Sequence, residues 1–346
     1  KNNMAEQIIS PGVFTNEDVP TITEAAAAPV GAAVIGPTPL GPMQIPTLCT
    51  TFSDFQAKFG RTFESGGVDY SFLTSQAAFN YFRQGGTNLL VTRAPSGSAA
   101  AYTGAVSTYV PSSGSNADND FECFTLKTIS QGTLMNSLGA VQDRDFATGS
   151  AGSANYESGS RDNLRWEITN TDYNKGTFTL TIRQGNDTNN AKKVLETFRG
   201  VNLDPNSDNF ISKRVGDQFK TLEGSGGDSP YIKVHGDYPN LSNYVFVSSI
   251  SSSTVDYLDS NGTIRDEELK KSMPQNSNGG FVSAGGTLFT TELKLGKDIT
   301  AANMQCLGTD QYNDAINLLK DKDLYYFNTL SLPGLICNST NQTTAQ

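Results

Sequence analysis

Two short regions of helical periodicity enclose a long β-type middle, and this arrangement limits the folds open to the chain. Apolar residues recur at helical spacing in 51–60, in 69–86 and again in 309–322. Between them, from about residue 100 to 250, the sequence has only short β-type runs separated by loops rich in Gly, Ser and Asn. The pattern predicts α/β segments that are interrupted by a β-rich region.

Local signals predict where several of these elements begin and end. The small residues of Val30–Ile35 predict a strand. The first helix is expected to have Ser53 as its N-cap and to stop at Gly60. The apolar run 88–95 predicts a buried strand, and 323–335 predicts a second buried strand that ends in a Pro-Gly turn.

The predicted order is strand, helices and strand near the start, and helix and strand near the end. This order indicates that both ends of the chain build one α/β portion. We expect an extended arm over 1–29, an α/β portion over 30–96 plus 285–346, and an inserted β-rich region over 97–284, of one or two domains. The insertion has the character of a β-sandwich or β-barrel, with a helix in the second half of 190–219. The predicted fold class is therefore α+β and multidomain.

Composition and charge exclude several classes of partner. The formal charge of −10 and the pI near 4.7 argue against nucleic acid, because the 25 basic residues are scattered rather than clustered. No apolar run reaches the roughly eighteen residues that span a membrane.

The four cysteines, Cys49, Cys123, Cys306 and Cys337, lie far apart, without metal-ligand spacing and with no signal peptide ahead of them. We expect reduced, mostly buried thiols in a soluble protein made inside a cell.

The sequence shows no motif in which several catalytic residue types occur together. His235 is the single histidine, so a triad or a histidine metal site would lack partners, and a surface or loop position is expected. No phosphate-binding glycine motif occurs. The chain has 35 acidic residues, yet nothing marks two of them as the facing carboxylates of a glycosidase. We therefore expect no enzymatic activity and no cofactor.

One segment, "YLDSNGTIRDEE", resembles a calcium loop in part. Asp259 and Asn261 take the third and fifth positions, Gly262 the sixth and Glu268 the twelfth. The first position is Tyr257, which cannot supply the leading carboxylate. An Asn-Gly turn followed by a short charged helix explains the same letters, so Asp259, Asn261 and Glu268 remain a weak calcium candidate.

The N-terminal segment "MAEQIISPGVFTNEDVP", residues 4–20, is extended and punctuated by turns, with too few apolar residues to form a core. An extended segment with unpaired backbone groups can add a strand to a neighbouring sheet. We expect residues 8–22 to pair with another chain in this way. The interface residues predicted are Ile8, Ile9, Pro11, Gly12, Val13, Phe14, Val19 and Ile22.

Five blocks, in order, resemble the contractile tail sheath proteins of tailed bacteriophages. The first is "SPGVFTNED", which is similar to the N-terminal arm of that family. The second is "PVGAAVIGPTPLGPMQIPTLCTTFSDFQAKFG" and the third is "QAAFNYFRQGGTNLLVTRAP". The fourth comprises "FTLKTISQGTLMNS" and "ETFRGVNLDPNSDNFISKRVGDQF", similar to the sheath β-sandwich domain. The fifth, "LGTDQYNDAINLLKDKDLYYFNTLSLPGL", resembles the entry to the central α/β domain, which is subtilisin-like in fold only.

The resemblance implies a structural subunit that polymerises helically around the tail tube. Contraction, triggered by the baseplate, would drive the tube through the host envelope during genome ejection. The implied partners are other sheath subunits, tail tube proteins and baseplate proteins, and neither nucleic acid nor a membrane. The implied location is the virion tail of a myovirus, such as a giant Pseudomonas phage of the phiKZ type, with assembly in the host cytoplasm.

The chain departs from the family after "LSLPGL", where a sheath protein would continue into further domains. This predicts a protease-resistant N-terminal fragment that is monomeric by itself. The resemblance implies that strand pairing between subunits uses the N-terminal arm and a second arm from the C-terminal part, and the fragment would lack the second arm. Two other classes compete with the sheath interpretation. A virion-surface β-sandwich module that binds carbohydrate would show an aromatic cleft, and a secreted glycosidase would show two carboxylates in a deep cleft.

Overall fold

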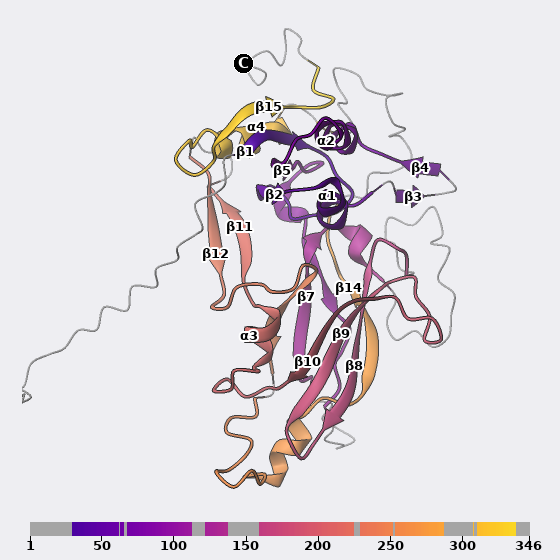
Figure 1. The fold of residues 1–346 in the computed structure, drawn as a ribbon, viewed down its shortest axis with the longest axis vertical. Coiled ribbons are helices and arrows are strands. Elements are labelled where there is room, and N and C mark those ends of the chain that lie inside the picture. The colour runs from indigo at the N-terminus through magenta and orange to yellow at the C-terminus, as the bar shows by residue number, and fades with distance from the viewer. Residues whose placement is uncertain are drawn as a thin grey trace, which may run out of the picture.

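The computed structural model describes residues 30–61, 63–65, 68–112, 122–137, 159–224, 229–251, 253–286, 307 and 310–336. Figure 1 shows two lobes, one above the other along the long axis. We call the upper one the α/β lobe. Its elements are β1 (Val30–Gly36), β2 (Thr47–Cys49), α1 (Phe52–Phe59), β3 (Phe63–Ser65), β4 (Val68–Tyr70), α2 (Leu73–Arg83), β5 (Leu89–Arg93), α4 (Asp310–Leu319) and β15 (Phe327–Ser331).

The α/β lobe is built on a four-stranded sheet of order β15-β1-β5-β2. Strand β1 pairs in parallel with both β15 and β5, and β2 runs antiparallel to β5. Side chains of β1 alternate between the two faces. Ala33 and Ile35 pack in the same core cluster as Tyr312 and Ala315 of α4, whereas Val34 packs in a cluster with Phe55 of α1. Helices therefore cover both faces of the centre of this sheet, as parallel strands require.

Helix α1 confirms the predicted stop but not the predicted start. Its N-cap is Thr51, whose hydroxyl accepts the Asp54 N–H at 3.0 Å, so the prediction of Ser53 as the cap is wrong. Ser53 is the second residue of the helix, so it already lies inside the first turn and cannot be the residue that precedes it. Gly60 ends the helix at φ 84°, a left-handed value that favours glycine.

Helix α2 is shorter than its apolar pattern predicts. It spans Leu73–Arg83, and Tyr70 belongs instead to the hairpin strand β4. The chain leaves α2 through Gly85 at φ 90°, a left-handed value that favours glycine. The apolar side chains of α2 are only partly buried, since Phe79 is 43% exposed while Ala78 is buried.

Strand β15 has the predicted position but not the predicted burial. Four of its five residues are exposed, although the apolar run suggested a buried strand. The reason is its place in the sheet. In the described part of the chain β15 lies at an edge, whereas the correctly predicted β5 lies between β1 and β2 and is buried throughout.

The lower part of Figure 1 is the β lobe, made from the middle of the chain. Its elements are η1 (Ala99–Ala101), β6 (Gly104–Ser107), β7 (Phe124–Gln131), η2 (Thr133–Met135), β8 (Leu164–Asp172), β9 (Thr177–Gln184), β10 (Val194–Val201), α3 (Ile211–Val215), β11 (Phe219–Glu223), β12 (Tyr231–His235), β13 (Val245–Ile250), η3 (Glu267–Ser272) and β14 (Ser277–Val282). Seven of these strands form one antiparallel sheet of order β10-β9-β8-β14-β6-β7-β13.

The seven-stranded sheet curls so that its two halves face each other. Strand β14 pairs with β8 through residues 277–280 and with β6 through residues 281–282, so it belongs to both halves. Across the core, Phe124 of β7 stacks on Phe178 of β9 with ring centroids 5.8 Å apart. Helix α3 lies between the edge strands β10 and β13 and contacts both. The predicted β-rich region is thus a curled antiparallel sheet.

The helix expected in the second half of 190–219 is present but short, and the first half of this range is strand. Residues 194–201 form β10, and only Ile211–Val215 are helical, with Phe210 as N-cap and Gly216 ending the helix at φ 106°. Ile211 and Val215 are fully buried in the main core of the β lobe. The helix therefore follows the predicted start at 204–210 and is held by its buried side chains.

Two of the four cysteines lie in the described residues, and both are free and buried, as expected. Burial raises the pKa of the Cys49 thiol and of the Cys123 thiol to about 12. Cys306 and Cys337 lie outside the described residues. The described residues contain no helix that is both long and apolar enough to cross a membrane.

Candidate functional site at the junction of the two lobes

The predicted arm interface lies outside the described residues. This holds for Ile8, Ile9, Pro11, Gly12, Val13, Phe14, Val19 and Ile22. The described chain begins at β1, in the centre of the four-stranded sheet. The candidate site that the structure does describe is the junction between the α/β lobe and the β lobe.

Arg93 holds this junction together. It ends β5 and is 2% exposed. Its Nη1 donates to the carbonyl oxygens of Gly41 at 2.8 Å and of Gln131 at 2.6 Å, and its Nη2 donates to that of Pro39 at 3.1 Å. The guanidinium also lies 5.7 Å from the ring centroid of Tyr102. Burial lowers the pKa of Arg93 to about 10, which still leaves it charged at neutral pH.

A second set of hydrogen bonds joins the same two segments. The N–H of Gly41 donates to Ser130 Oγ at 2.8 Å, and the N–H of Met43 donates to Gln131 Oε1 at 2.8 Å. The N–H of Gln131 donates in turn to the carbonyl of Gly41 at 3.2 Å. Since these bonds and the one from Arg93 to Gln131 span the junction, the loop after β1 and the end of β7 are fixed to each other.

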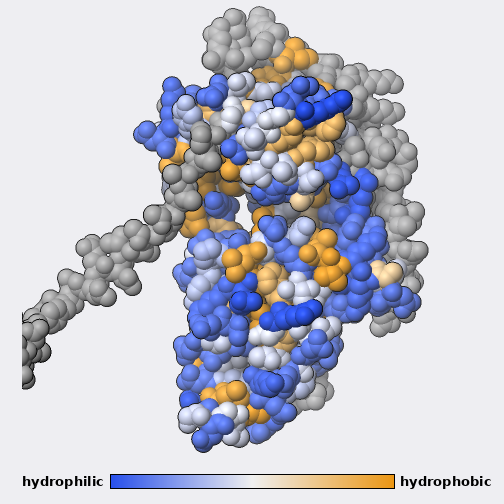
Figure 2. Space-filling view, in the orientation of Figure 1, coloured by the Kyte–Doolittle hydropathy of each residue, from blue (hydrophilic) through white to orange (hydrophobic). Residues whose placement is uncertain are grey.

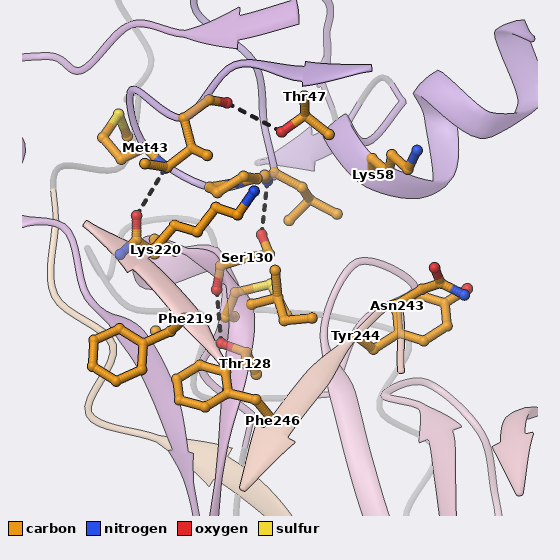
Figure 3. A pocket seen from close by; sticks show the side chains of 18 of the residues that line it. Met43, Thr47, Lys58, Thr128, Ser130, Phe219, Lys220, Asn243, Tyr244 and Phe246 are labelled. Carbon is orange, nitrogen blue, oxygen red and sulfur yellow. Dashed lines mark hydrogen bonds between the residues drawn. The ribbon is translucent and has the colours of Figure 1, made fainter. Parts of the chain in front are cut away.

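A cavity of about 1040 Å³ opens beside this junction. Figure 2 shows the surface hollowed between the two lobes. In Figure 3, Met43 and Thr47 of the α/β lobe face Ser130 and Lys220 of the β lobe. The buried Oε1 of Gln44, which also lines the cavity, has no hydrogen-bond partner in the described part of the chain.

Aromatic side chains line the β-lobe wall of this cavity. Phe219 stacks on Phe246 with centroids 5.4 Å apart, and Tyr244 lies nearby in the lining. His235 stacks on the other side of Phe219 at 4.7 Å, and its Nε2 lies 2.9 Å from Thr221 Oγ1. The single histidine is therefore half-buried on strand β12 and held by an aromatic ring and a hydroxyl, rather than placed in a loop.

The calcium-like segment forms the turn that its letters also predict. Asp259 Oδ1 accepts the N–H groups of Asn261 and Thr263, each at 2.8 Å, and Gly262 has φ 76°. The hydrogen bond from the Thr263 N–H is the main cause that lowers the pKa of Asp259, and the bond from the Asn261 N–H acts in the same direction. Glu268 pairs with Lys271 at 2.6 Å. In the ranges that the structure describes, no three His, Cys, Asp or Glu side chains are grouped as a metal ion requires.

The sequence reasoning missed a buried charge cluster on the β8–β9 hairpin. Asp187 is 1% exposed and meets Arg165 Nη1 at 2.7 Å and Arg183 Nε at 2.5 Å. Arg183 also reaches Glu167 at 3.2 Å, and Lys192 completes the cluster at 2.6 Å from Glu167. A signal was present, because Arg165 and Glu167 alternate with apolar residues of β8 and so share the face opposite the core.

The sequence matches no protein-family profile, and no curated protein matches it. Among solved structures, the sheath tail protein Lin1278 from Listeria innocua is similar with a TM-score of 0.41 and 11% identity, over 92% of this chain and 44% of that one. The sheath tail protein DSY3957 from Desulfitobacterium hafniense is similar with a TM-score of 0.37 and 12% identity, over 96% and 48%. The chain spans about half the length of these proteins, and likeness at this level does not establish a shared fold.

Proposed function

We propose that this chain is part of a structural subunit of a contractile phage tail sheath. The observation that carries the proposal is where the sheath-like sequence blocks fall. The block at 29–60 builds β1 and α1, and the block at 307–335 builds α4 and β15. These two blocks are far apart in the sequence, yet β1 and β15 pair in one sheet. A discontinuous α/β portion of this kind is what the resemblance to the sheath family predicts.

The domain division and the mechanism belong to the same proposal. Residues 30–96 and 285–346 would form the subtilisin-like core portion, and 97–284 would be an outward-facing insertion. Sheath subunits would assemble around the tail tube in an extended array and slide into a shorter one after a baseplate trigger, in the virion tail. Such sliding needs subunits that keep their shape. The hydrogen bond from Arg93 to Gln131, with those from Gly41 and Met43 to the end of β7, supports a subunit that moves as one body.

The N-terminal arm would link neighbouring subunits by strand addition. The test is electron microscopy of the full-length protein and of a variant that lacks residues 4–20. We expect hollow tubes with a regular helical repeat from the full-length protein and none from the deletion variant. A matched control reorders residues 4–20, so that length and composition stay the same while the pattern is lost. Monodisperse particles from the intact protein under every assembly condition would refute the proposal.

A second candidate function is carbohydrate binding at the lobe junction. The observation in its favour is the cavity of about 1040 Å³ with Phe219, Tyr244 and Phe246 in its lining. Aromatic rings and amide or hydroxyl groups together are a common lining for polar ligands. Calorimetric titration with bacterial-surface oligosaccharides tests it. Binding that Tyr244→Ala weakens would favour this candidate, and no heat of binding would remove it.

A further inference from the structure

The cavity at the lobe junction has a charge opposite to that of the whole chain. Its described lining contains one acidic side chain, Asp162. The basic side chains in the lining are Lys58, Arg61, Lys127, Arg161 and Lys220. The chain as a whole carries a formal charge of −10. Because a concave surface lined by one sign of charge raises the local concentration of the opposite sign, this cavity attracts anions.

Three of these basic side chains are available to an anion. Lys58 and Arg161 each pair with a neighbouring aspartate. Within the described residues, Arg61, Lys127 and Lys220 form no ion pair with a carboxylate. In Figure 3 the side chain of Lys220 extends from β11 into the space between the two lobes. The cavity therefore presents three positive charges without a partner in the described part of the chain.

Two of these cations lie next to the aromatic wall of the cavity. Lys127 is opposite Phe246 in the pairing of β7 with β13, so their side chains share one face of the sheet. Phe246 stacks on Phe219, the residue before Lys220, with centroids 5.4 Å apart. Tyr244 belongs to the same lining. Rings beside charged groups suit a ligand that has both apolar faces and charged substituents, as an acidic sugar has.

The lining also contains two amide oxygens that lack a donor. Gln44 Oε1 and Asn240 Oδ1 are buried and have no hydrogen-bond partner in the described part of the chain. Gln44 is 2% exposed and has φ 56°, a left-handed value that is uncommon for residues other than glycine. Strained residues of this kind cluster at ligand sites. A ligand hydroxyl that donates to these oxygens would remove the cost of leaving them unpaired.

We propose that this cavity binds an anionic oligosaccharide, whose sugars carry carboxylate or phosphate groups. This ligand class narrows the carbohydrate-binding candidate and rests on it. Arg61, Lys127 and Lys220 bind the acidic groups, the aromatic rings pack against sugar faces, and Gln44 and Asn240 accept hydrogen bonds from hydroxyls. The volume of about 1040 Å³ lies at the upper end of the range of ligand pockets, about 300–1,000 Å³, and so admits several sugar rings.

Calorimetric titration of the full chain with matched sugars tests the preference for charge. The acidic probes are tetragalacturonate, sialyllactose and phosphorylated mannopentaose, and their neutral partners are methyl-esterified tetragalacturonate, lactose and mannopentaose. We expect at least one acidic probe to bind about tenfold or more tightly than its neutral partner, because hydrogen bonds to charged groups distinguish the two. Inorganic phosphate should bind about tenfold more weakly than that probe, since it reaches the cations but not the rings and the amide oxygens.

Substitutions in the lining locate the site. Lys127→Gln and Lys220→Gln should each weaken binding of the acidic probe about tenfold. Lys233→Gln is the matched control, because Lys233 is exposed on the neighbouring strand β12 and lies outside the lining, and it should leave the affinity unchanged. Gln44→Met keeps the length of the side chain but removes the acceptor. It should weaken binding about fivefold and leave the urea midpoint unchanged, since Oε1 has no described hydrogen bond to lose.

Several results would overturn this assignment. They are the absence of binding by all three acidic probes, equal affinity for the acidic and neutral partners, binding of phosphate alone as tight as that of the sugars, and an equal loss in Lys233→Gln. Equal affinity for acidic and neutral partners would leave carbohydrate binding in place and remove only the preference for anions. Tube formation by the full-length protein is measured separately by electron microscopy, so a failure at this cavity leaves the sheath proposal unchanged.

Discussion

Replacing Arg93 by methionine tests how the two lobes are joined. Methionine has a similar length but no donors, so three charge-assisted hydrogen bonds to Gly41, Gln131 and Pro39 are lost. The carbonyl of Gly41 keeps the bond from the N–H of Gln131, whereas that of Pro39 loses the donor that the guanidinium provides. The contact with the Tyr102 ring is lost as well. The change therefore acts at the junction and on the loop after β1, and it removes no side chain of the described hydrophobic clusters.

The size of the effect follows from two opposing terms. Hydrogen bonds to a charged group contribute about 1.5–3 kcal/mol each. Against this, burial lowers the pKa of Arg93 from 12.5 to about 10, and removing the charge recovers about 3 kcal/mol of that cost. Since three such bonds are lost, the expected net loss is about 2–6 kcal/mol of unfolding free energy, which is large for one substitution.

Urea unfolding with two probes measures both the loss and its location. Trp166, the single tryptophan, is buried in the β lobe and reports on that lobe by fluorescence, while far-ultraviolet circular dichroism reports on the whole chain. In Arg93→Met we expect a lower midpoint and transitions that no longer coincide, because the lobes are less tightly coupled. Arg83→Met, on the exposed surface of α2, is the matched control and should stay within about 0.5 kcal/mol. If Arg93→Met matched this control and the two probes still coincided, the reasoning would be refuted.

Three further predictions test packing, the buried charges and the thiols. Phe55→Ala should cost about 3–5 kcal/mol in chemical denaturation because the ring is fully buried, whereas Phe79→Ala, 43% exposed, should cost much less; equal costs would contradict the core assignment. Asp187→Asn should lower the unfolding free energy by about 3–5 kcal/mol by leaving two buried arginines under-paired, and a neutral result by thermal denaturation would contradict this. Cys49 and Cys123 should react slowly with a thiol reagent at pH 8 in the folded protein and rapidly in urea, with the other two cysteines replaced by serine. Since burial raises the pKa of both thiols from 9.0 to about 12, their contribution to stability is complete below pH 9 and is lost as the pH rises towards 12; a flat stability profile over that range would contradict it.

The cavity lining can be compared with what the glycosidase interpretation requires. A glycosidase would bring two carboxylates together in a cleft. The cavity lining at the junction includes one acidic side chain, Asp162, and several basic ones, such as Lys127 and Lys220. Burial raises the pKa of Asp162, and its neighbour Arg161 opposes this effect. The described lining of this cavity does not contain the facing pair of carboxylates that the glycosidase interpretation predicts.

The sequence by itself determined the elements whose signals are local. Small and apolar runs predicted β1 and β5, and helical spacing predicted α1 and α4, because periodicity and capping act within a few residues. The Asn-Gly turn after Asp259 was equally readable, since its hydrogen bonds join near neighbours in the chain. The choice of Thr51 over Ser53 as the N-cap shows the limit of such signals at element ends.

Only the tertiary structure decided which apolar strand is buried and which charges are inside. The segments of β5 and β15 were both predicted to be buried strands, yet β5 lies between two strands and β15 at an edge of the described sheet, so their exposure depends on pairings with distant segments. Arg93 and Arg183 carry no local sign of burial. Each is buried because carbonyl or carboxylate oxygens from other segments converge on it, and that convergence exists only once the chain has folded.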